Sequence, residues 1–137
     1  MIVAIVGSRS FDDYALLCEF LKEVNHLITE IISGGAPGAD SLGEQYAKDH
    51  RIPFKLFPAD WDNISTPNAR VKKNRWGVLY NANAGKDRNR LMAEYLKEHD
   101  GVAAACWDGR SPGTAHMIEC CHELGVQVFI KDVGGNK

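Results

Sequence analysis

The feature of this chain that most constrains its fold is the alternation of short apolar runs with longer segments of helical periodicity. The runs are continuously apolar rather than alternating with polar residues, which is typical of strands that are buried on both faces of a sheet. Five runs are predicted to be such strands, at residues 2–6, 30–33, 54–57, 102–106 and 126–130.

The segments between these runs place apolar residues three and four positions apart, the spacing of an amphipathic helix. We expect helices over residues 13–25, from Ala39 onward, around residues 91–96 and over residues 117–124. Strands that alternate with helices form parallel sheets with right-handed crossovers and helices on both faces. The chain is therefore predicted to be one α/β domain over residues 1–137, a Rossmann-like three-layer α/β/α sandwich with a mainly parallel five-stranded sheet.

Charge and hydropathy argue against two classes of protein. The net charge of −2 argues against a protein whose main role is to coat nucleic acid. No apolar run approaches the roughly 20 residues that span a bilayer, so no membrane partner is expected. The first strand begins at Ile2 without a basic leader before it, which predicts a cytoplasmic protein.

One long segment interrupts the alternation. Residues 60–84 have no strong period and include Pro67, so they are predicted to be an irregular insertion in the domain. The insertion combines Trp76 with the cations Arg70, Lys72, Lys73 and Arg75. This composition is compatible with contact to single-stranded nucleic acid, with a solvated loop, or with an arm that grips a second subunit.

Three turns rich in glycine and serine follow predicted strands, namely Gly7-Ser8-Arg9-Ser10 and the turns at residues 33–40 and 108–114. Glycine lets the backbone approach a ligand, and the unpaired N–H groups at the start of the following helix attract anions. The first turn is neither a dinucleotide-binding fingerprint nor a P-loop. In an open parallel sheet all three turns lie at the carboxyl ends of the strands, so they are predicted to converge on one crevice.

A fourth element, residues 85–90, begins the third predicted helix and contains Arg88. A cation at a helix start opposes the helix dipole, which indicates an anionic partner. The planar guanidinium of arginine suits phosphate or carboxylate groups. Arg88 is therefore expected to contribute to the same anion site.

Taken in order, these motifs resemble those of the SLOG superfamily, and in particular its YspA-like branch of short bacterial and phage proteins. The resemblance implies a Rossmann-like fold, a nucleotide or nucleotide derivative as ligand, and a homo-oligomer. The motifs that carry it are Gly7-Ser8-Arg9, Gly34-Gly35-Ala36-x-Gly38-Ala39-Asp40, Pro58-Ala59-Asp60-Trp61, Arg88-Asn89-x-x-Met92 and Asp108-Gly109-x-Ser111-x-Gly113-Thr114.

Relatives in the superfamily imply two alternative functions. The Lonely Guy enzymes cleave nucleoside 5′-monophosphates with an arginine, which Arg88 resembles, and with a P-G-G-x-G-T-x-x-E motif. The turn at residues 111–114 resembles that motif, but Met117 occupies the glutamate position. A phosphoribohydrolase or deoxyribosyltransferase would need another carboxylate, and Asp60 and Asp108 are the candidates, with Arg88 as the third catalytic residue. The Smf/DprA relatives bind single-stranded DNA, which is the second alternative.

The sequence thus predicts, before these alternatives, a ligand-binding or sensing protein for a phosphate-bearing nucleotide. Arg88 is expected to clamp the phosphate or sugar, Asp40 or Asp108 to meet the ribose, and Trp61 to cover the base. No cofactor is expected, and the spacing of cysteine and histidine indicates no metal site. The expected ligand contacts are Gly7, Ser8, Arg9, Gly34, Gly35, Gly38, Asp40, Trp61, Arg88, Asn89, Ser111, Gly113 and Thr114.

Overall fold

Five parallel strands form the central sheet of the computed structural model, which describes residues 1–35, 38–61, 64–65 and 69–133. The order across the sheet is β3-β2-β1-β6-β7. The strands are β1 (Ile2–Gly7), β2 (Glu30–Ser33), β3 (Phe54–Leu56), β6 (Val102–Trp107) and β7 (Val128–Asp132). Every neighbouring pair in this sheet is parallel, so the predicted Rossmann-like α/β fold is confirmed.

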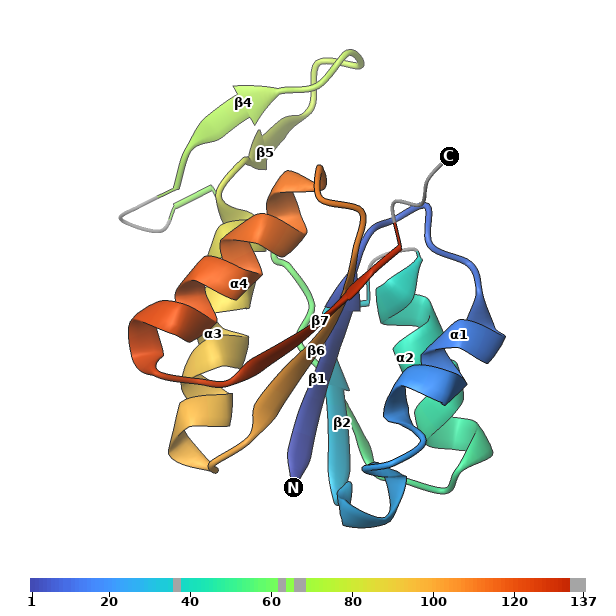
Figure 1. Ribbon diagram of the computed structural model, residues 1–137. Helices are drawn as coiled ribbons and strands as arrows, with labels where there is room; N and C mark the ends of the chain where they lie inside the picture. The colour runs from blue at the N-terminus through green and yellow to red at the C-terminus, as the bar shows by residue number, and fades with distance from the viewer. Residues whose placement is uncertain (36–37, 62–63, 66–68, 134–137) are drawn as a thin grey trace.

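Helices cover both faces of the sheet. They are α1 (Tyr14–Leu21), α2 (Ala39–Asp49), α3 (Ala84–Glu98) and α4 (Pro112–Leu124), and a short 3-10 turn, η1 (Asn25–Leu27), follows α1. Helices α1 and α2 lie on one face, and α3 and α4 lie on the other (Figure 1). Each face buries its own apolar cluster, which explains why the strands are apolar on both sides.

Several element boundaries differ from the prediction, and helices α3 and α4 begin earlier than expected, at Ala84 and Pro112. Helix α1 ends at Leu21 rather than near residue 25, and the chain continues into the 3-10 turn. Strand β7 begins at Val128 rather than at residue 126. The reason is that the Val126 N–H donates to the carbonyl of Cys121 at 2.8 Å, so this residue still belongs to the turn that closes α4.

The insertion at residues 60–84 contains regular structure that the sequence analysis did not predict. Strands β4 (Val71–Lys73) and β5 (Leu79–Asn81) pair antiparallel in a hairpin that projects beyond the starts of α3 and α4 (Figure 1). Its turn is held by Asn74, whose side-chain oxygen accepts from the N–H groups of Trp76 and Val78 at 2.8 and 3.0 Å. The prediction of irregular structure is therefore wrong for this part of the insertion.

The strand order fixes where a ligand can bind. From β1 the chain moves outward through β2 to β3, and it then crosses to β6 and β7 on the other side of β1. The order therefore reverses between β1 and β6, and helices diverge from the carboxyl ends of these strands. None of the described helices is both long and apolar enough to cross a membrane.

Candidate functional site

A cavity of about 410 Å³ lies at the point where the strand order reverses. Its lining comes from the end of β1 and its turn, from the first turns of α2 and α4, and from α3. The lining residues are Val6, Gly7, Arg9, Ser10, Asp40, Arg88, Asn89, Met92, Ser111, Pro112, Gly113, Thr114 and Met117. The predicted convergence of the first and third turns with Arg88 is thus observed.

Gly7 lets three elements meet at the base of the cavity. A Cβ atom at this position would lie 2.2 Å from the carbonyl oxygen of Cys106 and 2.7 Å from the Cβ of Ala39. Neither β6 nor α2 can retreat without opening the core, because Cys106 and Ala39 are both fully buried. The glycine therefore serves close packing between β1, β6 and α2.

Ser8 joins the first turn to the third and does not line the cavity. It is 1% exposed, and its N–H donates to the carbonyl of Cys106 at 3.0 Å. Its hydroxyl oxygen accepts from the Asp108 N–H at 3.0 Å and from the Ser111 hydroxyl at 3.1 Å. The side chain predicted to contact ligand is thus engaged within the protein.

Among the described residues, no side-chain cap is found for the start of α4, which lines the cavity. Ser111 occupies the N-cap position but makes no side-chain cap hydrogen bond, because its hydroxyl donates to Ser8 instead. The N–H groups of Gly113 and Thr114 therefore lack both an intrahelical acceptor and a side-chain cap. The turn is held from outside by Trp107, whose ring nitrogen donates to the carbonyl of Ser111 at 3.1 Å. Such a helix start binds anions.

Asp108 shapes this turn rather than facing the cavity. Its carboxylate accepts from the N–H groups of Arg110 and Ser111, both at 2.8 Å. These two bonds lower the pKa of Asp108 to about 2, so the group is ionised at neutral pH. The position of Asp108 is that of an aspartate that closes a turn on its own backbone.

Arg88 reaches the cavity from α3 with its guanidinium fixed. Nη1 donates to the carbonyls of Gly34 at 2.7 Å and Phe57 at 3.4 Å, and Nε donates to the side-chain oxygen of Asn89 at 3.2 Å. Burial lowers the pKa of Arg88, whereas the nearby Asp40 raises it and Arg9 lowers it further. These hydrogen bonds use Nε and Nη1, and a guanidinium carries two further N–H donors on Nη2.

Gly34 makes room for this guanidinium. A Cβ atom at position 34 would lie 1.9 Å from Nη1 of Arg88. The second predicted turn therefore contributes to the site by supporting Arg88, and Gly34, Gly35 and Gly38 do not line the cavity. Ala36 and Pro37 of this turn lie outside the described residues.

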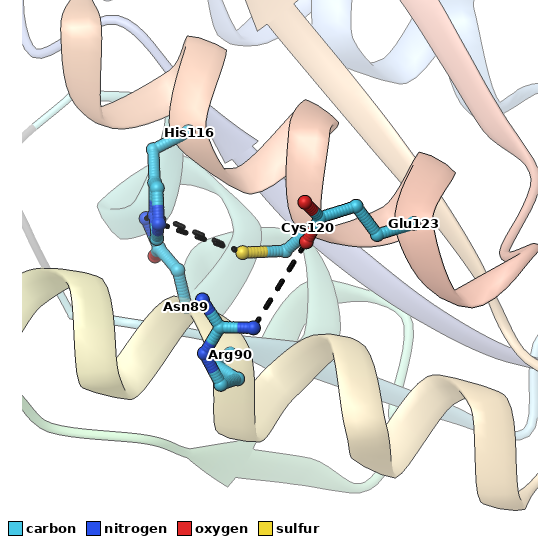
Figure 2. A network of polar contacts seen from close by, with 5 residues as sticks. All are labelled: Asn89, Arg90, His116, Cys120 and Glu123. Carbon is cyan, nitrogen blue, oxygen red and sulfur yellow. Dashed lines mark hydrogen bonds and ion pairs between the residues drawn. The ribbon is translucent and has the colours of Figure 1, made fainter.

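Asn89 ties α3 to the start of α4 (Figure 2). Its side-chain nitrogen donates to the carbonyl of Gly113 at 3.1 Å and to Nδ1 of His116 at 3.2 Å. Burial lowers the pKa of His116, and Lys86 and Arg90 lower it further, so the ring is a neutral acceptor. Cys120 lies 3.6 Å from Nε2 of the same ring. The network holds the turn at the start of α4 against α3.

Asp60 and Trp61 do not line the cavity. Trp61 is 41% exposed, and its ring lies against the first turn of α3, 3.3 Å from where a Cβ atom of Gly85 would stand. The N–H of Asn81 donates to the carbonyl of Trp61 at 2.7 Å, which ties this residue to the hairpin. The structure therefore gives no contact between the cavity and the predicted base cover.

The sequence analysis missed the apolar floor of the cavity. Met92 and Met117 are each 1% exposed and line it together with Val6. Met92 was noted only within a motif and Met117 only at the glutamate position, and the fold shows that both face the crevice. The described residues contain no group of three or more histidine, cysteine, aspartate or glutamate side chains placed to hold a metal ion.

Residues 1–63 match the model of YAcAr, described as the YspA, cpYpsA-related SLOG family. Over these residues the chain is similar to the YspA-like SLOG family. The predicted relationship is confirmed by this match, which includes the first two turns and ends before Arg88 and the turn at residues 108–114. Comparison of the chain with curated proteins and with solved structures gives no significant match.

Proposed function

We propose that the crevice binds a nucleoside 5′-phosphate or a related phosphorylated nucleotide derivative. The observation that carries this proposal is that the uncapped start of α4 and the fixed guanidinium of Arg88 line the same cavity. The volume of about 410 Å³ falls within the roughly 300–1,000 Å³ of small-molecule sites. The similarity of residues 1–63 to the YspA-like SLOG family supports a nucleotide-related ligand.

The cavity offers a separate place for each part of such a ligand. The phosphate would accept from the N–H groups of Gly113 and Thr114 and pair with Arg88. The carboxylate of Asp40, in the first turn of α2, would accept from a sugar hydroxyl. The methionine floor would lie under the apolar face of the sugar or base.

The same lining favours binding over cleavage of the glycosidic bond. That reaction needs a carboxylate beside the anomeric carbon to stabilise positive charge or to activate water. Of the residues that the structure describes, Asp40 is the only carboxylate lining the cavity, and it lies near the guanidinium of Arg88. Met117 occupies the position of the Lonely Guy glutamate and supplies a thioether. We therefore propose a ligand-binding or sensing protein.

Calorimetric titration with AMP, GMP, CMP and UMP, each beside its nucleoside, tests the proposal. We expect at least one phosphorylated compound to bind and its nucleoside to bind far more weakly. Arg88→Met should weaken binding about tenfold to a hundredfold, because a charge-assisted hydrogen bond is lost. Arg90→Met is the matched control, since Arg90 lies on the same helix and faces Glu123 at 4.0 Å outside the cavity.

Two outcomes would overturn the proposal. The first is the absence of binding by any phosphorylated compound, and the second is an equal loss in Arg88→Met and Arg90→Met. Incubation with the same nucleotides and chromatography for free base tests the enzyme alternative. We expect no release. Release that Asp40→Asn abolishes would replace binding by hydrolysis, with Asp40 as the relocated carboxylate.

A further inference from the structure

The β4–β5 hairpin carries a concentration of positive charge that the crevice does not use. Residues 69–81 contain Arg70, Lys72, Lys73 and Arg75 and no aspartate or glutamate. None of these cations lines the cavity. The hairpin is thus a strongly cationic surface on a chain whose net charge is −2.

Both faces of the hairpin are open to solvent. Lys72 pairs with Tyr80 and Lys73 pairs with Leu79 across the two strands. Because neighbouring residues of a strand point to opposite faces, each face presents one lysine. On one face Val71 and Leu79 are each 46% exposed beside Lys73, and on the other face Lys72 is exposed and Tyr80 is half-buried, so neither face is packed on a core. A two-stranded hairpin that buries neither face has little stability of its own.

The tip of the hairpin adds an aromatic platform. Trp76 is 73% exposed, and the guanidinium of Arg75 lies 4.5 Å from the centre of its ring. Asn74 fixes the backbone beneath it by accepting from the N–H groups of Trp76 and Val78. A ring held this way offers a face on which a base can stack, and stacking of this kind is tolerant of sequence.

We propose that the β4–β5 hairpin is a second binding surface, separate from the crevice, for single-stranded nucleic acid. Cations on both faces can follow a flexible phosphate backbone, and the exposed indole can stack on one base. A second copy of this chain fits less well. Protein–protein interfaces contain few lysines, and the centre of such an interface contains few charged residues, whereas this surface has two lysines and two arginines.

Fluorescence anisotropy with a labelled oligodeoxythymidylate of about 15 nucleotides tests the proposal on the full chain. If the four cations of the hairpin each neutralise one phosphate, the logarithm of the affinity should fall with the logarithm of the salt concentration with a slope of about −3. Binding should then be roughly 60-fold weaker at about 200 mM KCl than at about 50 mM. Trp76→Ala should weaken binding about tenfold. The double variant Lys72→Ala/Lys73→Ala should halve the salt slope.

The matched control is Lys48→Ala/Lys97→Ala, which removes the same charge from the last turns of α2 and α3, at the opposite end of the molecule (Figure 1). We expect it to bind like the wild type. No binding near 50 mM salt, or an equal loss in the control, would overturn the proposal. A dimer in sedimentation that Trp76→Ala disrupts, without oligonucleotide binding, would assign the hairpin to a second copy instead.

This outcome is independent of the crevice. The hairpin variants should bind nucleotide as the wild type does, because none of the substituted residues lines the cavity. Failure of oligonucleotide binding alone would leave the crevice proposal standing. Failure of nucleotide binding alone would leave the hairpin proposal standing.

Discussion

The crevice and the hairpin use the same kinds of side chain in opposite ways. In the crevice Arg88 is held by three hydrogen bonds and sits directly over Gly34. In the hairpin Arg75 lies over an indole that is itself largely exposed. A fixed guanidinium loses little freedom when a ligand arrives, whereas exposed long side chains must be ordered by the partner. The difference is consistent with the small ligand that we propose for the crevice and with the extended one that we propose for the hairpin.

The largest effect should come from the packing beneath the crevice. Gly7→Ala places a methyl group against the buried backbone of β6, so we expect about 3 kcal/mol loss in the free energy of unfolding. Urea denaturation measures it. Gly113→Ala, where a Cβ atom meets nothing within 4 Å, should not lower stability. Equal losses in both variants would contradict the preformed crevice.

The second effect concerns how the crevice holds its cation. In Gly34→Ala the new methyl displaces the flexible guanidinium of Arg88, so nucleotide affinity should fall about tenfold while the fold remains stable. Because both changes act on the same group, Gly34→Ala/Arg88→Met should bind no worse than Arg88→Met alone. Titration calorimetry on the three variants provides the measurement. Additive losses would show that the two residues act independently.

A smaller effect depends on pH. The folded-state pKa of Asp108 is lowered to about 2, so its bonds to the turn stabilise the protein above the unfolded-state pKa of roughly 4. That contribution is lost as the pH falls from about 4 through about 2. The melting temperature of Asp108→Asn should therefore lie below that of the wild type at pH 7 and converge on it near pH 2. A difference that stays constant with pH would disprove the assignment.

The smallest effect should come from the hairpin. Trp76→Ala should change the free energy of unfolding by no more than about 0.5 kcal/mol, because the ring is 73% exposed. Trp107→Ala is the comparison beside the crevice, since that ring packs against a core cluster and donates to the carbonyl of Ser111. We expect it to cost about 3 kcal/mol. Thermal unfolding of both variants shows whether the two regions differ as the structure indicates.

Sequence patterns predicted the strands of the main sheet and helices α2 to α4, because these elements depend on local periodicity. They also predicted the location of the crevice, because parallel strands share one direction. They did not predict the hairpin, because its strands are exposed on both faces and show no alternation. The roles of Ser8 and Asp108 also escaped prediction. The Asp108 N–H donates to the Ser8 hydroxyl, and these residues are 100 positions apart in the sequence. Sequence patterns do not reveal such a contact, so Ser8 was predicted to contact a ligand although it supports the turn at residues 108–114.

The hydroxyl of Ser111, which bonds to Ser8 rather than capping α4, has a consequence for local motion. A helix without its cap frays in its first turn, and the amides there exchange with solvent faster than those further along. An anion seated on Gly113 and Thr114 would take over the missing cap. Binding of a ligand in the crevice should then be detectable as slower hydrogen exchange at the start of α4 and, through the contact of Asn89, in α3.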